Sequence, residues 1–310
     1  MSFSSDCKDE LIRIRVKSAE QRLSQLSGLT FTSGGIRISR RPALFYHTEN
    51  AGTAKHIASI ALSLYDLDAV IEEKRVEHRR RPIYEVTLSG KDTDRLLSET
   101  GAMTASENGI RLMTEIPGCV SKNEETKRAF LRGCFLGSGS CVDPKRGYHL
   151  EMIFRASTVA QKAAELIRGF QLPAKRSVRN GDRFLVYLKD GDDVSGMLAL
   201  IGASSAALAL ENVRVEKDVR NYVNRTTNCE AANLDKQVTA SIRQQAAIRL
   251  IDSQIGLTSL PVSLQQAARL RVANPDASVQ ELADLAEIQK SGMYHRLDRL
   301  MKIAEGLEEE

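Results

Sequence analysis

The feature that most constrains the fold is an internal repeat in the first two thirds of the chain. Residues 26–34 (LSGLTFTSG) and 131–139 (LRGCFLGSG) lie 105 residues apart, and each is an apolar run with glycine third and Ser-Gly at its end. A capping-box pattern precedes each run, from Ser18 to Gln21 and from Ser121 to Glu124. Each run therefore predicts a helix that ends at Ser-Gly, where glycine enters the left-handed region.

The segments that follow the two helices also repeat. In each half, the pattern predicts two short strands, a helix, two more strands and a closing helix. The predicted segments are 35–47, 53–62, 70–76, 83–88 and 92–100 in the first half, and 141–155, 159–167, 174–178, 184–188 and 192–201 in the second. Two αββαββα units in tandem predict one pseudo-two-fold α+β domain, with helices on one face of antiparallel sheets.

The two nine-residue runs resemble the LAGLIDADG helices of homing endonucleases. In that family two such helices pack side by side, and small residues, here Gly28 and Gly133, permit their close approach. The resemblance implies a carboxylate at the penultimate position of each helix to hold the metal ions, but Ser33 and Ser138 stand there. Because metal-dependent phosphodiester cleavage needs anionic ligands, we expect no catalytic residues, no metal, no cofactor and no enzymatic activity.

Basic residues gather around the predicted strands of this domain. They are Arg37, Arg40, Arg41, Arg75, Arg79, Arg80, Arg81, Lys145, Arg146, Arg155, Lys175, Arg176, Arg179 and Arg183. Such a set is compatible with contacts to DNA phosphates, and equally with solvated turns diluted by nearby acids. Residues 1–225 carry 35 basic and 28 acidic residues, whereas residues 226–310 carry 9 and 12. The balance permits an acidic partner for the first part without requiring one.

The last third is predicted to be helical and to end in a helix-turn-helix. A long amphipathic segment over 226–256 is followed by helices from Ser263 to Ala273 and, after a third capping box at Ser278, to Ala286. The break Glu287-Ile288-Gln289 leads to a last helix from Lys290 to Met301. The residues expected to face inward are Leu282, Leu285, Ile288, Met293, Leu297 and Leu300. This is the tri-helical pattern of DNA-binding domains.

The last helix supplies the candidate DNA-binding residues. Lys290, Ser291, Tyr294 and His295 are predicted to reach base edges, whereas Arg296 and Arg299, with Lys302, are predicted to contact phosphates. A tri-helical protein-binding module is the alternative, favoured by the modest charge and the acidic tail of this part.

The combination of a degenerate double LAGLIDADG domain and a helix-turn-helix resembles the WhiA family of bacterial regulators. The matching segments are 130–140, 148–151, 228–234, 248–251, 274–278 and 290–297. The resemblance implies a transcription regulator that binds double-stranded DNA and acts in cell division, chromosome segregation and sporulation. Two departures lie in the turn, where the family has Gly-Ile-Ser and this chain has Glu287 and Gln289. A non-glycine at the left-handed position is expected to cost about 1 kcal/mol.

We therefore predict a LAGLIDADG-like domain over 1–222, a helical linker over 223–258 and a DNA-binding domain over 259–310. Five scattered cysteines and the absence of a signal or spanning segment predict a cytoplasmic protein with no membrane contact. With the family resemblance, we expect it to be nucleoid-associated and to have other transcription or division proteins as further partners. The rival hypotheses are an active nuclease, a protein-binding scaffold with weak non-specific DNA affinity, and a nucleotide-binding enzyme based on Gly137-Ser-Gly139, which lacks the preceding strand that such a site needs.

Overall fold

The computed structural model describes residues 2–39, 42–75, 82–106 and 109–308. The chain divides into two compact units, Met1–Lys217 and Asp218–Glu310, and the boundary lies within helix α8 (Ser204–Gln254). None of the helices in the described residues is long and apolar enough to cross a bilayer. Arg40, Arg41, Arg79, Arg80 and Arg81, five of the basic residues considered above, lie outside the described residues.

The first half of the unit Met1–Lys217 contains one antiparallel sheet, whose strands run in the order β1-β2-β4-β3. Its elements are α2 (Ala19–Ser33), β1 (Gly34–Arg37), β2 (Ala43–Thr48), α3 (Ala51–Leu62), β3 (Leu67–Lys74), β4 (Ile83–Gly90) and α4 (Thr93–Glu99). The helix-strand order is the one that the sequence predicts for a single αββαββα unit.

The second half repeats this topology with the strand order β7-β8-β10-β9. Its elements are α5 (Glu124–Ser138), β7 (Ser140–Cys141), β8 (Leu150–Phe154), α6 (Ser157–Gly169), β9 (Lys175–Arg179), β10 (Arg183–Leu188) and α7 (Gly191–Ile201). Two sheets of equal strand order, each with its own helices, confirm the predicted α+β fold with a pseudo-two-fold repeat.

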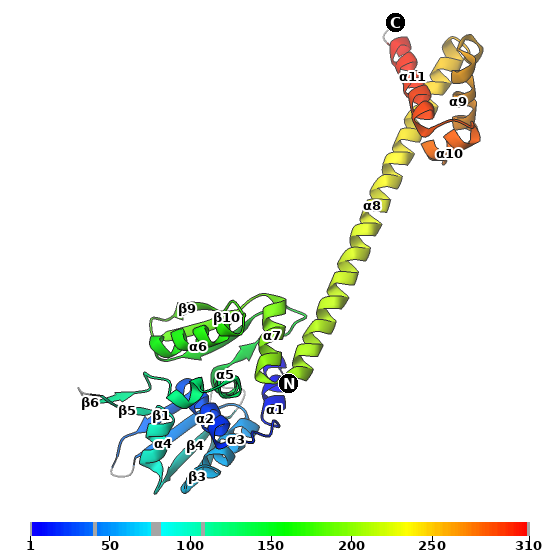
Figure 1. Ribbon diagram of the computed structural model, residues 1–310. Coiled ribbons are helices and arrows are strands. Elements are labelled where there is room, and N and C mark those ends of the chain that lie inside the picture. Colours follow the sequence, from blue (N-terminus) through cyan, green and yellow to red (C-terminus); the bar gives the residue numbers. More distant parts are fainter. Residues whose placement is uncertain (1, 40–41, 76–81, 107–108, 309–310) are drawn as a thin grey trace. The chain divides into compact units, whose positions relative to one another are not determined.

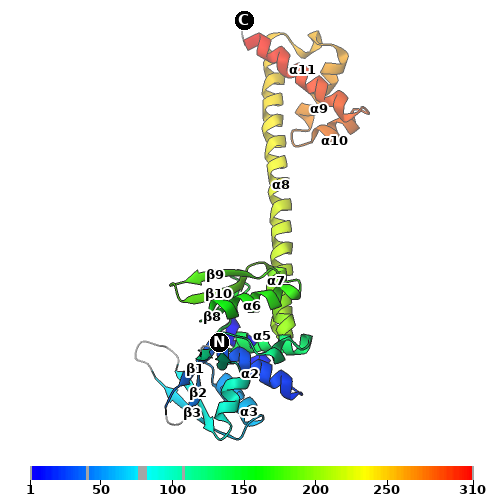
Figure 2. The same cartoon turned by 60° about the vertical axis from the view of Figure 1, so that its left-hand side comes forward.

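The two repeat helices, α2 and α5, lie side by side between the two sheets (Figures 1 and 2). A Cβ atom on Gly28 would collide with the Phe130 carbonyl oxygen and come within 2.8 Å of the Cys134 nitrogen. A Cβ atom on Gly133 would collide with the Gln25 carbonyl oxygen and come within 3.1 Å of the Leu29 nitrogen. The helices thus touch backbone to backbone, which only glycine permits at these two positions.

Both repeat helices end differently from the prediction. Gly34 and Gly139 have φ of −80° and −66°, in the extended rather than the left-handed region. Glycine is needed there for space, because a Cβ atom at Gly34 would lie 2.9 Å from the Thr30 Cα, and one at Gly139 would collide with Phe135. The left-handed cap predicted from the Ser-Gly ending is therefore wrong, although the ends of the helices are correct.

The start of α5 also differs from the prediction. Ser121 lies in a short 3-10 helix η1 (Gly118–Ser121), and the helix cap is Asn123, whose side chain accepts from the Thr126 amide at 2.9 Å. The Thr126 hydroxyl in turn accepts from the Asn123 amide, so the capping box begins two residues later than predicted. At α2 the Ser18 side chain accepts from the Gln21 amide, which is one of the two hydrogen bonds of the predicted capping box.

Helix α1 (Phe3–Leu11) and a β-hairpin are among the elements of this unit that the sequence did not predict. Helix α1 joins the second sheet through Ser4, whose hydroxyl donates to the Cys141 carbonyl at 2.7 Å and accepts from the Cys141 amide at 2.8 Å. A separate hairpin, β5 (Met103–Ser106) and β6 (Gly109–Leu112), follows the first half.

Alternation along the strands gives each sheet one buried and one open face. In β8, for example, Leu150, Met152 and Phe154 are buried, whereas Glu151 and Ile153 are half-buried. Residues such as these form one continuous core with the repeat helices. The opposite faces carry the polar side chains discussed below.

The unit Asp218–Glu310 is helical and has its own core. Besides the greater part of α8, it contains η2 (Leu257–Ser259), α9 (Val262–Ala273), α10 (Val279–Leu285) and α11 (Lys290–Glu308). Ile248 and Ile251 of α8 pack in one core with residues of α9, α10 and α11, including Met293 and Leu297. The predicted capping box is present, because the Ser278 and Glu281 side chains each accept from the other residue's amide.

The burial of two residues in this unit differs from the prediction. Leu285, predicted to face inward, is 56% exposed, because α10 ends there and the chain turns. Arg271, by contrast, is buried, and its guanidinium donates to the carbonyl of Ala277 at 2.6 Å and to those of Asn274 and Pro275 at 3.4 Å. These hydrogen bonds stabilise the loop that connects α9 and α10.

Candidate functional site

The exposed side of α11 is the first candidate surface. Met293, Leu297 and Leu300 are buried against the other helices, so a helix period of 3.6 residues turns Ser291 and His295 outward. Tyr294 is 60% exposed, and its ring meets the His295 ring edge-on, with centroids 6.1 Å apart. The polar residues predicted for this helix are thus brought together on one solvent-facing surface.

The cations of α11 differ in their availability. Lys290 and Arg299 are exposed, and neither forms an ion pair with any residue that the structure describes. Arg296 is half-buried and donates to the Gln266 side chain of α9 at 3.2 Å. Lys290 and Arg299 therefore present their full charge to solvent, whereas Arg296 is already bound to a neighbouring helix.

Asp298, which the sequence analysis did not single out, lies on the same side of α11. Its carboxylate forms an ion pair with the Lys302 ammonium at 2.9 Å, which raises the pKa of Lys302. The i,i+4 spacing of Asp298 and Lys302 was the available sequence signal for this pair. Lys302, predicted to contact phosphate, is therefore paired with Asp298.

The turn before α11 has the strained conformation predicted from its sequence. Glu287 has φ of +52°, in the left-handed region that favours glycine, and the Ile288 amide donates to the Ala283 carbonyl at 3.0 Å. The Glu287 carboxylate belongs to an exposed residue next to the first turn of α11.

Replacing Glu287 with glycine is expected to raise the free energy of unfolding of the unit Asp218–Glu310 by about 1 kcal/mol. The gain comes from removing the Cβ atom at a positive φ, partly offset by the greater freedom of glycine in the unfolded chain. Urea unfolding followed by circular dichroism measures it. Glu287→Ala keeps the Cβ atom and is the control, so equal stability of the glycine and alanine variants would contradict the assignment of strain.

Ser33 and Ser138 lie at the ends of the paired helices α2 and α5, as predicted. The Ser33 hydroxyl donates to the Leu29 carbonyl at 3.1 Å, and the Ser138 hydroxyl donates to the Ile153 carbonyl and accepts from the Ile153 amide, both at 2.8 Å. Both side chains are therefore engaged with backbone groups. No cluster of His, Cys, Asp or Glu in the described part of the chain has the arrangement of a metal site.

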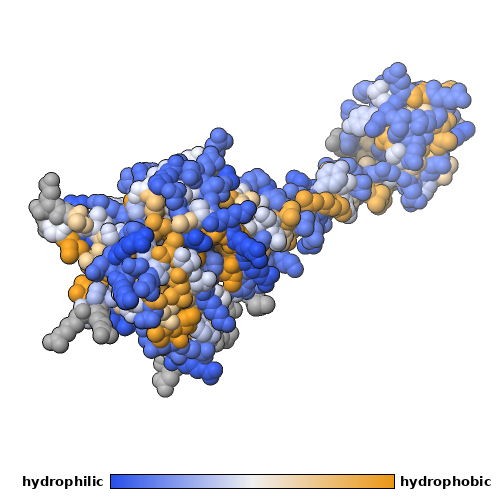
Figure 3. All heavy atoms as spheres, turned by 60° about the horizontal axis from the view of Figure 1, so that its bottom comes forward, coloured by the Kyte–Doolittle hydropathy of each residue, from blue (hydrophilic) through white to orange (hydrophobic). Residues whose placement is uncertain are grey.

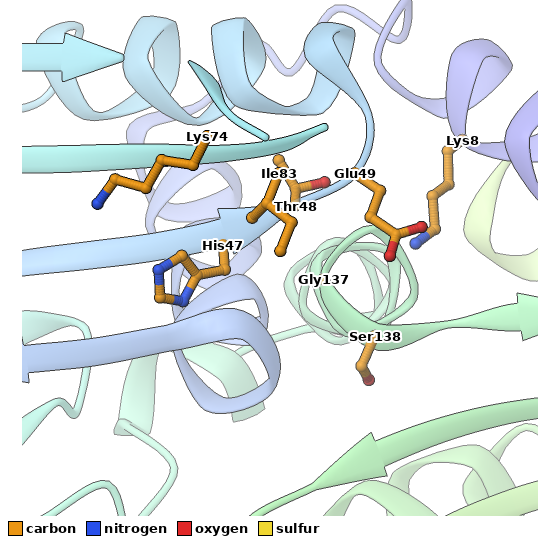
Figure 4. Close-up of a pocket in the computed structure, with 8 residues that line it drawn as sticks. All are labelled: Lys8, His47, Thr48, Glu49, Lys74, Ile83, Gly137 and Ser138. Atoms are coloured by element: carbon orange, nitrogen blue, oxygen red, sulfur yellow. The ribbon is translucent and has the colours of Figure 1, made fainter. Parts of the chain in front are cut away.

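A cavity of about 460 Å³ opens beside the end of α5, with Gly137, Ser138, Lys8 and Glu49 among the residues that line it (Figure 4). The side chain of Lys8, from α1, lies next to the Glu49 carboxylate in this view. Burial lowers the pKa of Lys8 to about 8, while the charge of Glu49 acts in the opposite direction. Lys8 and Glu49 thus line the cavity together with Ser138 at the end of α5.

Lysine, histidine and arginine side chains surround the buried Glu85 on the open face of the first sheet. Lys74 lies 2.9 Å, His47 2.8 Å and Arg37 3.3 Å from its carboxylate oxygens. Hydrogen bonds from Lys74 and His47 hold the pKa of Glu85 below its usual range. The single carboxylate is shared by Arg37 and Lys74 and so offsets part of their positive charge.

The open face of the second sheet also carries cations beside a glutamate. Lys175, Arg179 and Arg183 alternate onto its open face, and all three are exposed. Glu151 of the same face accepts from Arg179 at 3.4 Å and lies 3.1 Å from the His149 ring. Lys175 and Arg183 form no ion pair within the described residues, so this face carries unpaired positive charge.

Comparison with known proteins identifies the family. The WhiA LAGLIDADG-like domain matches residues 127–220, and the WhiA C-terminal HTH domain matches residues 223–304. A protein of Clostridium beijerinckii named probable cell division protein WhiA is 37% identical over 312 residues, which cover 99% of each chain. The chain belongs to the WhiA family. A probable cell division protein WhiA of Thermoanaerobacter sp. strain X514 is 38% identical and covers 100% of this chain and 99% of its own.

Solved WhiA structures share the fold. The crystal structure of full-length DUF199/WhiA from Thermotoga maritima matches with a TM-score of 0.61 and 25% identity, over 98% of both chains. The N-terminal LAGLIDADG domain of DUF199/WhiA matches with a TM-score of 0.52 and 20% identity, over 65% of this chain and 90% of that one. The WhiA resemblance read from the sequence, a LAGLIDADG-like domain followed by a helix-turn-helix, is therefore confirmed.

Proposed function

We propose that this WhiA protein is a sequence-specific transcription regulator that binds double-stranded DNA through α11 and acts in bacterial cell division. The relatives named probable cell division proteins support the process. The proposal also includes a role in chromosome segregation and, where it occurs, in sporulation. It further includes a cytoplasmic, nucleoid-associated location and contacts with other transcription or division proteins. It assigns 1–222 to the LAGLIDADG-like domain, 223–258 to a helical linker and 259–310 to DNA binding.

The observation that carries the proposal is the exposed surface of α11. Lys290, Ser291, His295 and Arg299 project from a helix whose other side is fixed by Met293, Leu297 and Leu300 in a packed core. A rigid helix fits the major groove, and side chains near its start can hydrogen-bond to base edges. Unpaired Lys290 and Arg299 add the charge that phosphates attract.

A selection from a random duplex pool tests the sequence specificity. The full-length chain is expected to enrich one motif, and its affinity for that motif is expected to fall steeply between 50 and 200 mM salt. Enrichment of no motif, with equal retention of all duplexes, would contradict a sequence-specific regulator.

We further propose that the LAGLIDADG-like domain has no nuclease activity. The hydroxyls of Ser33 and Ser138, already bonded to backbone groups, support this, as does the cationic Lys8 that lines the cavity beside Ser138. Supercoiled plasmid incubated with the purified chain and Mg²⁺ or Mn²⁺ is expected to stay intact on an agarose gel. Nicking that depends on the metal and survives further purification would overturn this part of the proposal.

A protein-binding scaffold is the second candidate, and it is favoured for the unit Met1–Lys217. The Glu85 cluster reduces the charge available to phosphates on the first sheet. Apolar side chains also remain on the surface of this unit, among them Ile38, Ile110 and Val178, and orange apolar patches stand among blue residues in Figure 3. DNA affinity that is unchanged by substitutions in α11, with little salt dependence, would favour the scaffold.

A further inference from the structure

A cleft of about 460 Å³ lies between α8 and α11 within the unit Asp218–Glu310. Lys236, Thr239 and Arg243 line it from α8, and Tyr294, Asp298 and Met301 line it from α11. The α8 residues lie in the predicted linker, outside the predicted DNA-binding domain. The cleft therefore brings a second helix beside the candidate recognition helix.

The two α8 cations share one helix face and are free to bind an anion. Lys236 and Arg243 are seven residues apart, two helical turns or about 10 Å along the axis. Both are exposed, and neither pairs with an acid in the described residues. Of the two acids that line the cleft, Asp298 is already paired with Lys302, and Asp235 precedes Lys236 on α8. The cleft therefore carries two unpaired cations against one unpaired acid.

The position of these cations follows from the dimensions of a helix in the major groove. The groove is about 12 Å wide, and a helix with its side chains is about 10–12 Å across, so a bound helix has a phosphate backbone along each flank. The flank of α11 that carries Tyr294 and Met301 is the one that faces Lys236 and Arg243. Lysine and arginine side chains on this flank can contact the neighbouring phosphate backbone, and such contacts position a protein without reading bases.

We propose that Lys236 and Arg243 of α8 form a second, phosphate-binding edge of the DNA site, on the backbone that flanks the groove occupied by α11. The inference rests on the proposed function. It extends the DNA-contacting surface into the residues predicted to form only a linker. Because the two cations are about 10 Å apart, each meets a separate phosphate and displaces its own counterion. The Thr239 hydroxyl, between them on the same face, is a further donor to this backbone.

The test measures the salt dependence of binding to the selected duplex and to a scrambled duplex. Lys236→Gln, Arg243→Gln and the double variant are compared with Arg220→Gln, an exposed arginine of α8 about 34 Å along the helix from Arg243. Each cleft variant is expected to reduce the slope of log affinity against log salt by about 1, and the double variant by about 2. Both duplexes should be affected equally, so that the ratio of their affinities is unchanged.

The outcomes separate the inference from the proposed function. If the wild type binds the motif and His295→Ala loses discrimination, but the cleft variants keep the slope of Arg220→Gln, then the second edge is refuted and α11 alone forms the DNA site. If the wild type shows no salt-dependent duplex binding, both fail together. Circular dichroism confirms that each variant is folded, which is expected because all three positions are exposed.

Discussion

Replacing Gly133 with alanine is expected to lower the free energy of unfolding of the unit Met1–Lys217 by about 3 kcal/mol. The new Cβ atom would collide with the Gln25 carbonyl oxygen and approach the Gln25 carbonyl carbon at 2.9 Å. These are backbone atoms of the partner helix, so the clash is relieved only by moving α2 and α5 apart, and overpacking of a fixed core typically costs 1–3 kcal/mol.

Urea unfolding of the full-length chain, followed at a far-ultraviolet helix signal, measures this loss. Gly169→Ala is the matched control, because Gly169 ends α6 and nothing lies within 4 Å of an added Cβ atom. The control is expected to be neutral or slightly stabilising, since alanine favours a helix over glycine. Equal midpoints for Gly133→Ala and Gly169→Ala would show that the two helices do not meet at these glycines.

Removing Arg299, one of the two exposed and unpaired cations of α11, is expected to have the largest effect on DNA binding. Arg299→Ala should weaken binding to the selected duplex about 10- to 100-fold, because a phosphate or base contact by arginine is lost without affecting the core. His295→Ala should reduce discrimination between the selected and scrambled duplexes by a similar factor, because side chains near the start of the helix are the ones that reach base edges. Fluorescence anisotropy at fixed salt measures both.

Arg269→Ala supplies the control for these variants. Arg269 is exposed on α9 and, like Arg299, pairs with no described acid, so it removes the same charge from another helix. Its loss is expected to change affinity only by the small amount that one distant charge contributes. An Arg269→Ala loss as large as that of Arg299→Ala would mean that general charge, and not the α11 surface, governs binding.

The fold was predictable to the extent that it depends on local pattern. The repeat is visible in the sequence both at Gly28 and Gly133 and in the pattern of the strands that follow each helix. The capping box at Ser278 is predictable because it involves only two residues three positions apart. The errors arise where a longer-range contact decides. Asn123 rather than Ser121 caps α5, because the Thr126 hydroxyl also donates to the Val120 carbonyl at 3.0 Å. Gly34 is extended because it is also the first residue of β1.

The candidate site was predictable in its helix and not in its surroundings. Burial of Met293 and Leu297 at helical spacing already places Ser291 and His295 outside. The partners of the polar residues depend on the fold, as when Arg296 meets Gln266 or when Lys74 and His47 converge on Glu85. The cleft beside Tyr294 joins residues nearly sixty positions apart, and no local pattern contains it.

Our central proposal is that α11 reads DNA sequence in a protein that occupies its sites without cutting them. Genome-wide crosslinking of the wild type beside an Arg299→Ala, Tyr294→Ala double variant, expressed at equal level, tests this most directly. The wild type is expected to give discrete peaks that share one motif and to leave the DNA unbroken, and the variant is expected to lose those peaks. Peaks of unchanged position and height in the variant would contradict the claim.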